Sequence, residues 1–497
     1  MRRVRATAAS LLLALALAGC SGTTEPAAPS PTPSSSAATP TATPTEEPAD
    51  EPDDGADDPA YDVALSEPVE DRVYPEVGDP GVDALHYDLD LTWQPGRSRL
   101  TGTERLTFRA TADADQVQLD LVPQLDVSGV TLDGEEVGVE RRGKDLVVAA
   151  DVVADERYVL TVDYSGTPRP VAAPTTRQDI PGLGWTIADD GSVWTMQEPF
   201  GAHTWYAVND QPSDKALYDF TLRVPRPMVG VANGELTSRS SRRGLEVTEW
   251  HLAEPAASYL VTVAFGDYVT SEVTSESGVP VSIWLPRSER ALMAELRRTT
   301  VDSLTWTEQR LGPYPFDTLG FLFVDSLSGM ETQTMVTLGL TDYTLSQPVL
   351  IHEVVHQWWG NQVTPRDWRD LWMNEGMTMY LQAMWEAEHG GLPLEDRIAG
   401  WAASGQELRD QAGPPAAYDA RAFAEANVYF LPAVMWHEVR QEVGDDTFFR
   451  LVREWPASRD NGVSHYRDLA GWWSRKSGTD LSPIFREHLL GEQQPQP

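Results

Sequence analysis

The stretch LIHEVVHQWWGNQVTPRDWRDLWMNE (350–375) brings potential metal ligands close together in the chain. His352 and His356 are four residues apart, so on an α-helix their imidazoles project from one face and can reach the same metal ion. Glu353 lies one position round the helix, beside the place where a water molecule on that metal would lie. This HExxH pattern arises by chance in about one chain in a hundred of this length, so it needs support from the rest of the sequence.

A catalytic zinc site takes three protein ligands and leaves one position open. Glu375 follows His356 by 19 residues, which leaves room for a turn and a second helix. Its neighbours are large and apolar (LWMNEGM, 371–377), which indicates a position facing the core. An unpaired carboxylate there is costly, whereas one bound to zinc is not. The sequence therefore predicts one Zn²⁺ per chain, held by His352, His356 and Glu375.

The same pattern gives Glu353 a chemical role. Zinc lowers the pKa of a bound water molecule towards 7, and a neighbouring carboxylate can take the proton of that water as it attacks a carbonyl group. We therefore expect Glu353 to act as the general base of a hydrolytic reaction.

Residues 352–376 resemble the zinc signature of the aminopeptidase N family of gluzincins, in which HExxH is followed by eighteen residues and a glutamate. Two other segments share the resemblance: EPFGAHTWYAVNDQPSDKALYDFTLRVP (198–225) and LGPYPFDTLGFLFVDSLSGMETQTM (311–335). The likeness covers about residues 80–497. It implies a multidomain α and β protein, with an N-terminal antiparallel β-domain followed by a thermolysin-like, mostly helical catalytic domain. The implied activity is a zinc-dependent aminopeptidase that removes N-terminal residues from peptides.

The resemblance also assigns roles to residues outside the zinc signature. Recognition of a free α-ammonium calls for fixed carboxylates, and the likeness identifies Glu331 and Glu198 as these groups. Gly329 and Met330 precede Glu331 in the loop that lines the substrate cleft. Tyr429 matches the tyrosine whose hydroxyl stabilises the oxyanion. Judged without the likeness, both glutamates would be ordinary surface acids, and Tyr429 could be a packed core tyrosine.

Five positions depart from the family pattern: Ser328, Thr332, Gln382, Leu431 and Pro432. Two flank the Gly-Met-Glu sequence, where the family has Gly and Asn. Gln382 replaces a common glutamate, and a neutral amide there weakens metal binding modestly. Leu431 and Pro432 replace a basic residue and glycine after the tyrosine. We expect Pro432 to begin a helix, because its fixed backbone angle suits the first turn.

Patterns of apolar residues place the predicted domains along the chain. Between 77 and 275, short runs alternate in polarity, as in HYDLDLTW (86–93), and turn sequences separate them, which is typical of an antiparallel β-domain. The catalytic domain is expected over 276–497. Its first helix is expected to begin at Ser288 as the N-cap and to end at the prolines of GPYPF (312–316).

The N-terminal residues have the features of an export signal. A basic start and a short apolar run precede LAGC (17–20), which resembles the bacterial lipobox. Cys20 is the only cysteine, so disulfides within the chain and a cysteine-ligated zinc site are excluded. We expect residues 1–20 to be a lipoprotein signal peptide with lipidation at Cys20. Residues 21–76, rich in Pro, Ser, Thr and acid, are expected to be a disordered linker. We expect the exported chain to face the outside of the cell, held at the cell membrane by the lipid anchor.

The charge of the chain excludes several kinds of partner. Asp and Glu number 76 against 38 Lys and Arg, giving a formal net charge of −38. Phosphate backbones and anionic lipid head groups repel such a chain, so no nucleic acid and no membrane contact other than the lipid anchor is expected. The expected partners are peptides with a free N-terminus.

Two rival interpretations stay open on the sequence alone. One is a non-catalytic surface lipoprotein that binds peptides with the same fold, which the five departures favour and the intact Glu353 opposes. The other is a zinc endopeptidase, which would not depend on Glu331. The resemblance also leads us to expect a short form without the family's helical C-terminal domain, with a more open site that limits substrate length poorly.

Overall fold

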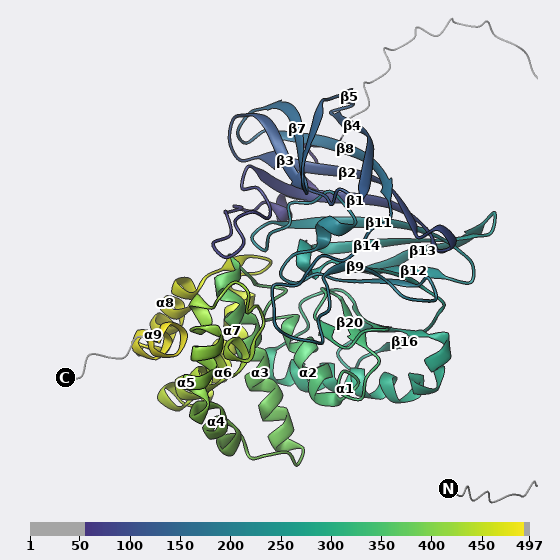
Figure 1. The fold of residues 1–497 in the computed structure, drawn as a ribbon. Coiled ribbons are helices and arrows are strands. Elements are labelled where there is room, and N and C mark those ends of the chain that lie inside the picture. The colour runs from purple at the N-terminus through teal and green to yellow at the C-terminus, as the bar shows by residue number, and fades with distance from the viewer. Residues whose placement is uncertain (1–54, 492–497) are drawn as a thin grey trace, which may run out of the picture. The chain divides into compact units, whose positions relative to one another are not determined.

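The structure is a computed structural model that describes residues 55–491, which fall within one compact unit reaching from Asp53 to Pro497. Strands dominate its purple-to-teal part and helices its green-to-yellow part (Figure 1). The predicted signal peptide, Cys20 and the first part of the predicted linker lie outside the described residues. Among the helices of residues 55–491, none combines the length and the apolar character needed to cross a membrane.

An eight-stranded sheet forms the centre of the β-domain, in the order β13-β14-β11-β1-β2-β8-β4-β5. Its pairs are antiparallel, with the exception of β1 and β11, which run parallel. The prediction of a largely antiparallel domain is confirmed. The strands are β1 (Val82–Gln94), β2 (Arg99–Ala110), β4 (Leu125–Leu132), β5 (Glu135–Glu136), β8 (Arg157–Gly166), β11 (Lys215–Pro225), β13 (Glu235–Arg242) and β14 (Leu245–Ala257).

Two smaller sheets complete this domain. A three-stranded sheet has the order β3-β7-β6, and a four-stranded sheet has the order β12-β15-β10-β9. Their strands are β3 (Ala114–Asp120), β6 (Val139–Arg142), β7 (Asp145–Val152), β9 (Gly184–Ile187), β10 (Val193–Met196), β12 (Val229–Ala232) and β15 (Val263–Gly266).

Alternation of polarity predicted the buried face of β1 correctly. Tyr87, Leu89, Leu91 and Trp93 are at most 2% exposed, whereas the residues between them are half-buried or exposed. Side chains two apart on a strand share a face, so this pattern fixes which face of the sheet packs into the core.

The predicted linker ends earlier than residue 76. Residues 59–64 form a 3₁₀-helix, η1 (Pro59–Ala64), and Asp71 and Tyr74 are buried. The Asp71 carboxylate accepts hydrogen bonds from the backbone N–H groups of Tyr74 and Trp368, and the Tyr74 hydroxyl donates to the carbonyl of Ala420. These contacts with the predicted catalytic domain offset the entropy cost of ordering the segment, which its few apolar residues could not offset.

The catalytic domain begins with a five-stranded sheet, in the order β16-β17-β18-β20-β19. Because β16 pairs with β17 and not with the β-domain, the boundary predicted at residue 275 is wrong and lies before Tyr268. A hairpin turn at residues 275–279 lies at the predicted boundary, and a turn between two strands cannot be told from a linker by composition. The strands are β16 (Tyr268–Thr274), β17 (Pro280–Pro286), β18 (Leu319–Val324), β19 (Gly329–Met330) and β20 (Met335–Gly339).

The rest of the catalytic domain is mostly helical, as predicted. Its α-helices are α1 (Met293–Leu311), α2 (Gln347–His356), α3 (Leu371–Glu388), α4 (Leu394–Ala403), α5 (Gly405–Ala412), α6 (Ala426–Val443), α7 (Asp445–Ala457), α8 (Tyr466–Ser477) and α9 (Ser482–Leu490).

Short elements in both domains connect the larger ones: η2 (Pro95–Arg97), η3 (Ala202–Thr204), η4 (Ser258–Leu260), η5 (Arg287–Leu292), η6 (Trp368–Asp370), η7 (Pro415–Ala417), β21 (Thr364–Pro365) and β22 (Val463–Ser464).

Two predicted helix starts are wrong. Ser288 lies inside the 3₁₀-helix η5, and α1 begins at Met293. Pro432 does not begin a helix but lies inside α6, which starts at Ala426. The proline packs against α3, since a Cβ atom added to Gly376 would lie 2.3 Å from Pro432 Cβ. This close approach of α3 and α6 requires glycine at position 376.

Lys215, at the start of β11, joins the β-domain to the loop that follows α2. Its Nζ donates hydrogen bonds to the carbonyl of Asn361 at 2.9 Å and to that of Gln362 at 3.4 Å. The side chain is buried, and burial lowers its pKa to about 7, although Glu254 and Asp460 favour the cation.

We expect Lys215→Met to change how stability depends on pH. In the unfolded chain the lysine keeps a pKa of about 10.4. Between pH 7 and that value the unfolded state binds a proton that the folded state lacks, so the free energy of unfolding of the wild type rises with pH relative to the variant. The slope is at most about 1.4 kcal/mol per pH unit. Urea unfolding from pH 6 to 9.5 measures it, with the exposed Lys476→Met as control; parallel curves for wild type and Lys215→Met would contradict the expectation.

Candidate functional site

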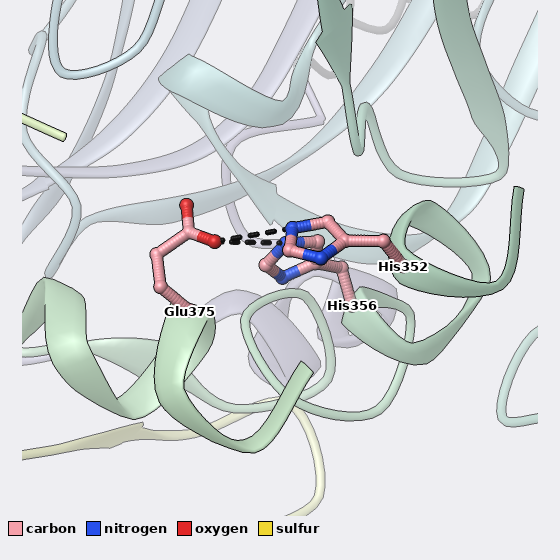
Figure 2. A group of neighbouring side chains, drawn as sticks. All are labelled: His352, His356 and Glu375. Carbon is pink, nitrogen blue, oxygen red and sulfur yellow. Dashed lines mark hydrogen bonds and ion pairs between the residues drawn. The ribbon is translucent and has the colours of Figure 1, made fainter. Parts of the chain in front are cut away.

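Three side chains from two helices meet as the sequence predicts. His352 and His356 project from α2 and Glu375 from α3, and the carboxylate of Glu375 points between the two imidazoles (Figure 2). Glu375 Oε2 lies 3.2 Å from His352 Nε2 and 3.5 Å from His356 Nε2. One potential ligand atom from each residue lies within 4.8 Å of the others. Two imidazoles and a carboxylate at such separations are a donor set that suits zinc.

The outer ring nitrogens of both histidines have partners that orient them. His352 Nδ1 lies 3.0 Å from Gln382 Oε1, and His356 Nδ1 lies 3.1 Å from the carbonyl of Trp359. Acceptors at both Nδ1 atoms favour a proton there, so each Nε2 can present its lone pair to a metal ion when one is bound. The geometry therefore fits a metal at the centre of the three residues.

The electrostatics of the cluster favour a cation at this point. Although burial disfavours its charged form, the carboxylates of Glu331 and Glu375 raise the pKa of His356 to about 10. Burial alone would raise the pKa of Glu375, but the His356 cation and hydrogen bonds from both histidines lower it. In the protein alone, a proton on His356 supplies the positive charge that these carboxylates attract. A metal ion would supply it when bound.

Glu353 points into the same space from the next position on α2. A Cβ atom added to Gly329 would lie 2.8 Å from Glu353 Oε1, so only glycine allows this carboxylate its place. Burial raises the pKa of Glu353 to about 8, and the carboxylates of Glu331 and Glu375 add to the rise against the opposing His356 cation. A carboxyl group with a pKa near neutrality can both take and return a proton.

A cleft of about 360 Å³ contains every predicted site residue within the described chain. They line it together: Glu198, Gly329, Met330, Glu331, His352, Glu353, His356, Glu375 and Tyr429. The structure thus brings residues from both domains to one place, while their individual roles stay predictions. Cys20, the predicted lipidation site, lies outside the described residues.

Glu331 and Glu198 each have a carboxylate oxygen with no hydrogen-bond partner. Within residues 55–491, Glu198 Oε1 and Glu331 Oε1 are both buried and unpaired in this sense. The backbone of Glu331 is held firmly, because its carbonyl accepts from Gln357 Nε2 at 3.0 Å and from Asn361 Nδ2 at 2.6 Å. Burial, and then repulsion by Glu331, raises the pKa of Glu198 well above its usual range. Two such carboxylates on one cleft form a site for a positively charged ligand.

Comparison with known proteins agrees with this geometry. The sequence model of the Peptidase M1 N-terminal domain matches residues 83–260, and that of the Peptidase family M1 domain matches residues 297–488. Together they cover more than half of the chain and both of its domains. The chain is a member of peptidase family M1.

Relatives within family M1 are similar over part of their length. Human aminopeptidase B is 29% identical over 328 residues, covering 60% of this chain and 49% of that protein. Aminopeptidase N of Streptomyces lividans is 24% identical over 429 residues, covering 80% of this chain and 49% of that protein. This M1 chain therefore spans about half the length of the curated relatives it matches.

A solved M1 structure is similar over nearly its whole length. A mutant of the M1 zinc metallopeptidase from Deinococcus radiodurans, bound to a Tyr-Ser-Ala substrate, superposes with a TM-score of 0.75 at 25% sequence identity. The match covers 86% of this chain and 99% of that chain. The fold expected for both domains is thereby confirmed.

Two departures from the M1 pattern leave the cleft loop intact. Thr332 is fully buried and its hydroxyl bonds to the carbonyl of Met335 and to the hydroxyl of Thr337. The carbonyl of Ser328 accepts a hydrogen bond from the backbone N–H of Gly339 at 2.9 Å. The hydroxyl and backbone groups at these positions thus hold the loop that presents Glu331.

A third departure, Gln382, contacts the predicted metal ligand His352 directly. Its Oε1 faces His352 Nδ1, and its Nε2 donates to Glu386 Oε1 at 2.9 Å. A glutamate at 382 would place two carboxylates against each other, whereas the amide offers an acceptor to His352 and a donor to Glu386. Leu431 is buried in α6, beside Pro432.

Arg177 and Asp179 also line the cleft of this M1 protein, and no motif in the sequence pointed to them. Arg177 Nη1 donates to the Tyr429 hydroxyl at 3.2 Å, and its Nε and Nη2 donate to the two oxygens of Asp179. Neither residue belongs to a local motif. An arginine and an aspartate two residues apart in the segment between β8 and β9 are a weak signal, because such pairs are common in surface loops.

We expect Gln382→Leu to weaken zinc binding by about 10–100-fold, because His352 Nδ1 loses the acceptor that orients its ring. Competition for Zn²⁺ with a coloured chelator measures the affinity. The exposed Gln411→Leu makes the same chemical change away from the site and should bind zinc like the wild type. An affinity for Gln382→Leu within twofold of the control would show that the amide does not support the metal.

Proposed function

We propose that this M1 chain is a zinc aminopeptidase that hydrolyses the first peptide bond of substrates with a free N-terminus. The observation that carries the proposal is the pair of buried carboxylate oxygens on Glu331 and Glu198 that accept no hydrogen bond within the described chain, in the cleft that also holds the His352, His356 and Glu375 donor set. An ammonium group bound there is held by charge-assisted hydrogen bonds and relieves the repulsion between the carboxylates.

The residues of the cleft divide the chemistry among them. Bound to His352, His356 and Glu375, a zinc ion would polarise the scissile carbonyl and make water a nucleophile near neutral pH. Glu353 takes the proton of the attacking water and delivers it to the nitrogen that leaves. The Tyr429 hydroxyl donates to the carbonyl oxygen as negative charge develops on it. Glu331 and Glu198 fix the N-terminus, which places the first peptide bond at the reacting groups.

Removal of the base should separate catalysis from metal binding. We expect Glu353→Gln to retain about one zinc per chain and to lose about 10²–10⁴-fold in kcat, because the amide cannot take a proton. Zinc analysis and release of a fluorophore from a panel of aminoacyl amides give the two readings. The exposed Glu442→Gln serves as the control. Zinc bound to the wild type with no turnover of any substrate would favour a non-catalytic peptide-binding protein.

Loss of the ammonium site should depend on the charge of the substrate. We expect Glu331→Gln to lower kcat/KM for free peptides about 10–100-fold, the loss of one charge-assisted hydrogen bond. The wild type should not cleave the same peptides after N-acetylation. Equal cleavage of free and acetylated peptides, with no effect of Glu331→Gln, would identify an endopeptidase.

We also propose that the chain is exported and held at the outer face of the cell membrane through a lipid on Cys20. Support comes from the sequence: the basic start, the short apolar run and the lipobox resemblance of residues 17–20. We expect the wild type to sediment with membranes in a bacterial host and Cys20→Ala to be released. Membrane association that survives this substitution would contradict the anchor.

A further inference from the structure

Tyr429 receives a hydrogen bond from a residue of the other domain. In the described part of the chain its hydroxyl has one hydrogen-bond partner, Arg177 Nη1, at 3.2 Å. A guanidinium group donates hydrogen bonds and cannot accept them. The tyrosine oxygen is therefore the acceptor in this contact, and its own proton is left for an acceptor elsewhere. Because Tyr429 lines the cleft beside the ring of His352, with ring centroids 6.1 Å apart, the cleft is the space into which that proton can be donated.

Arg177 is itself held in a fixed orientation. Asp179 accepts from Nε at 3.1 Å and from Nη2 at 2.6 Å, and the carbonyl of Ala424 accepts from Nη1 at 3.2 Å. The planar guanidinium thus uses one edge for a two-pronged ion pair and another for the start of α6. The Arg177 side chain is 27% exposed, so its charge is only partly screened by solvent.

The segment that carries Arg177 is fastened to the catalytic domain. We name residues 174–183 the strap; it precedes β9 in the β-domain. The carbonyl of Pro174 accepts from the backbone N–H of Phe423, and the backbone N–H of Thr176 donates to Glu425 Oε1 at 3.3 Å. These contacts lie immediately before α6, whose first turn holds Tyr429. The strap therefore places Arg177 against the tyrosine independently of the Arg177–Tyr429 contact itself.

We propose that Arg177 is a positioning residue that turns the hydroxyl proton of Tyr429 towards the substrate carbonyl oxygen. The inference rests on the proposed function, since it acts through the tyrosine that stabilises the oxyanion. The positive charge next to the phenol also strengthens the proton donation as the carbonyl oxygen becomes negative. This help exists mainly in the transition state, so its loss should reduce kcat and leave KM nearly unchanged.

A double-mutant cycle tests whether Arg177 acts through Tyr429. We expect Arg177→Gln to lower kcat about 10–100-fold with KM within about threefold of the wild type. In the Tyr429→Phe background, the same substitution should change kcat less than about threefold, because no hydroxyl proton remains to be oriented. If Arg177 only anchors the strap, the two losses multiply and KM rises, and the inference is overturned.

Two further variants guard against simple loss of structure. Arg169→Gln removes an exposed arginine shortly before the strap and should retain full activity. Asp179→Asn keeps Arg177 but replaces a charged partner with a neutral one, and should give an intermediate loss of kcat. An Asp179→Asn variant as active as the wild type, with Arg177→Gln unfolded at the assay temperature, would assign Arg177 a structural role.

Binding of a transition-state mimic separates this inference from the proposed function. Calorimetry on the zinc-loaded protein gives the affinity for a phosphinic dipeptide without turnover. We expect Arg177→Gln to weaken binding by the factor by which it lowers kcat/KM, and to have no further effect in the Tyr429→Phe background. If Arg177→Gln weakens binding only when Tyr429 is present, and the wild type releases no N-terminal residues, the proposed function fails and the inference stands. Turnover with independent effects overturns the inference alone, and absence of both binding and turnover overturns both.

Discussion

Repulsion between buried carboxylates is the constraint on which the cleft depends. Glu331, Glu353 and Glu375 lie around His356, and Glu198 approaches from the β-domain. Buried charges of one sign are tolerated only when cations are near them. Within the described chain these cations are Arg177 and a protonated His356. A metal at the histidines and an ammonium at Glu331 would each relieve the same repulsion. Cofactor and substrate would therefore both be stabilised by the same set of carboxylates.

The supporting contacts come from elements far apart in the chain. Gln382 of α3 orients a histidine of α2, while Asn361 links the carbonyl of Glu331 to the loop that Lys215 holds from the β-domain. The backbone groups in these contacts would be present whatever residues carried them. The side chains of Gln382, Asn361 and Lys215 are specific, because each supplies the donor or acceptor that its neighbour requires. Hydrogen bonds that cross between elements therefore hold the walls of the cleft in place.

The cluster of two histidines and a glutamate could be predicted from the sequence because its geometry is local. Residues four apart share a helix face, and an acid among large apolar residues needs a partner, so His352, His356 and Glu375 follow from spacing and burial. Alternation gave the buried face of β1 in the same way. The other side of the cleft could not be predicted, because Arg177 meets Tyr429 across 252 residues and no periodicity encodes that contact. The errors have the same origin: residues 55–76 look like a linker by composition, and Pro432 looks like a helix start, until tertiary contacts decide otherwise.

The strap has a consequence for how such chains can be recombined. Sequence models divide the protein into an N-terminal and a catalytic module, yet one wall of the catalytic cleft is a loop of the first module bonded to the second through Phe423, Ala424 and Glu425. A hybrid made by joining these modules from different relatives would keep this seam only if the loop of one half still matched the backbone at Phe423 and Ala424 and the carboxylate of Glu425 in the other. The two modules are thus not independent at the cleft, because the pairing between them forms part of its wall.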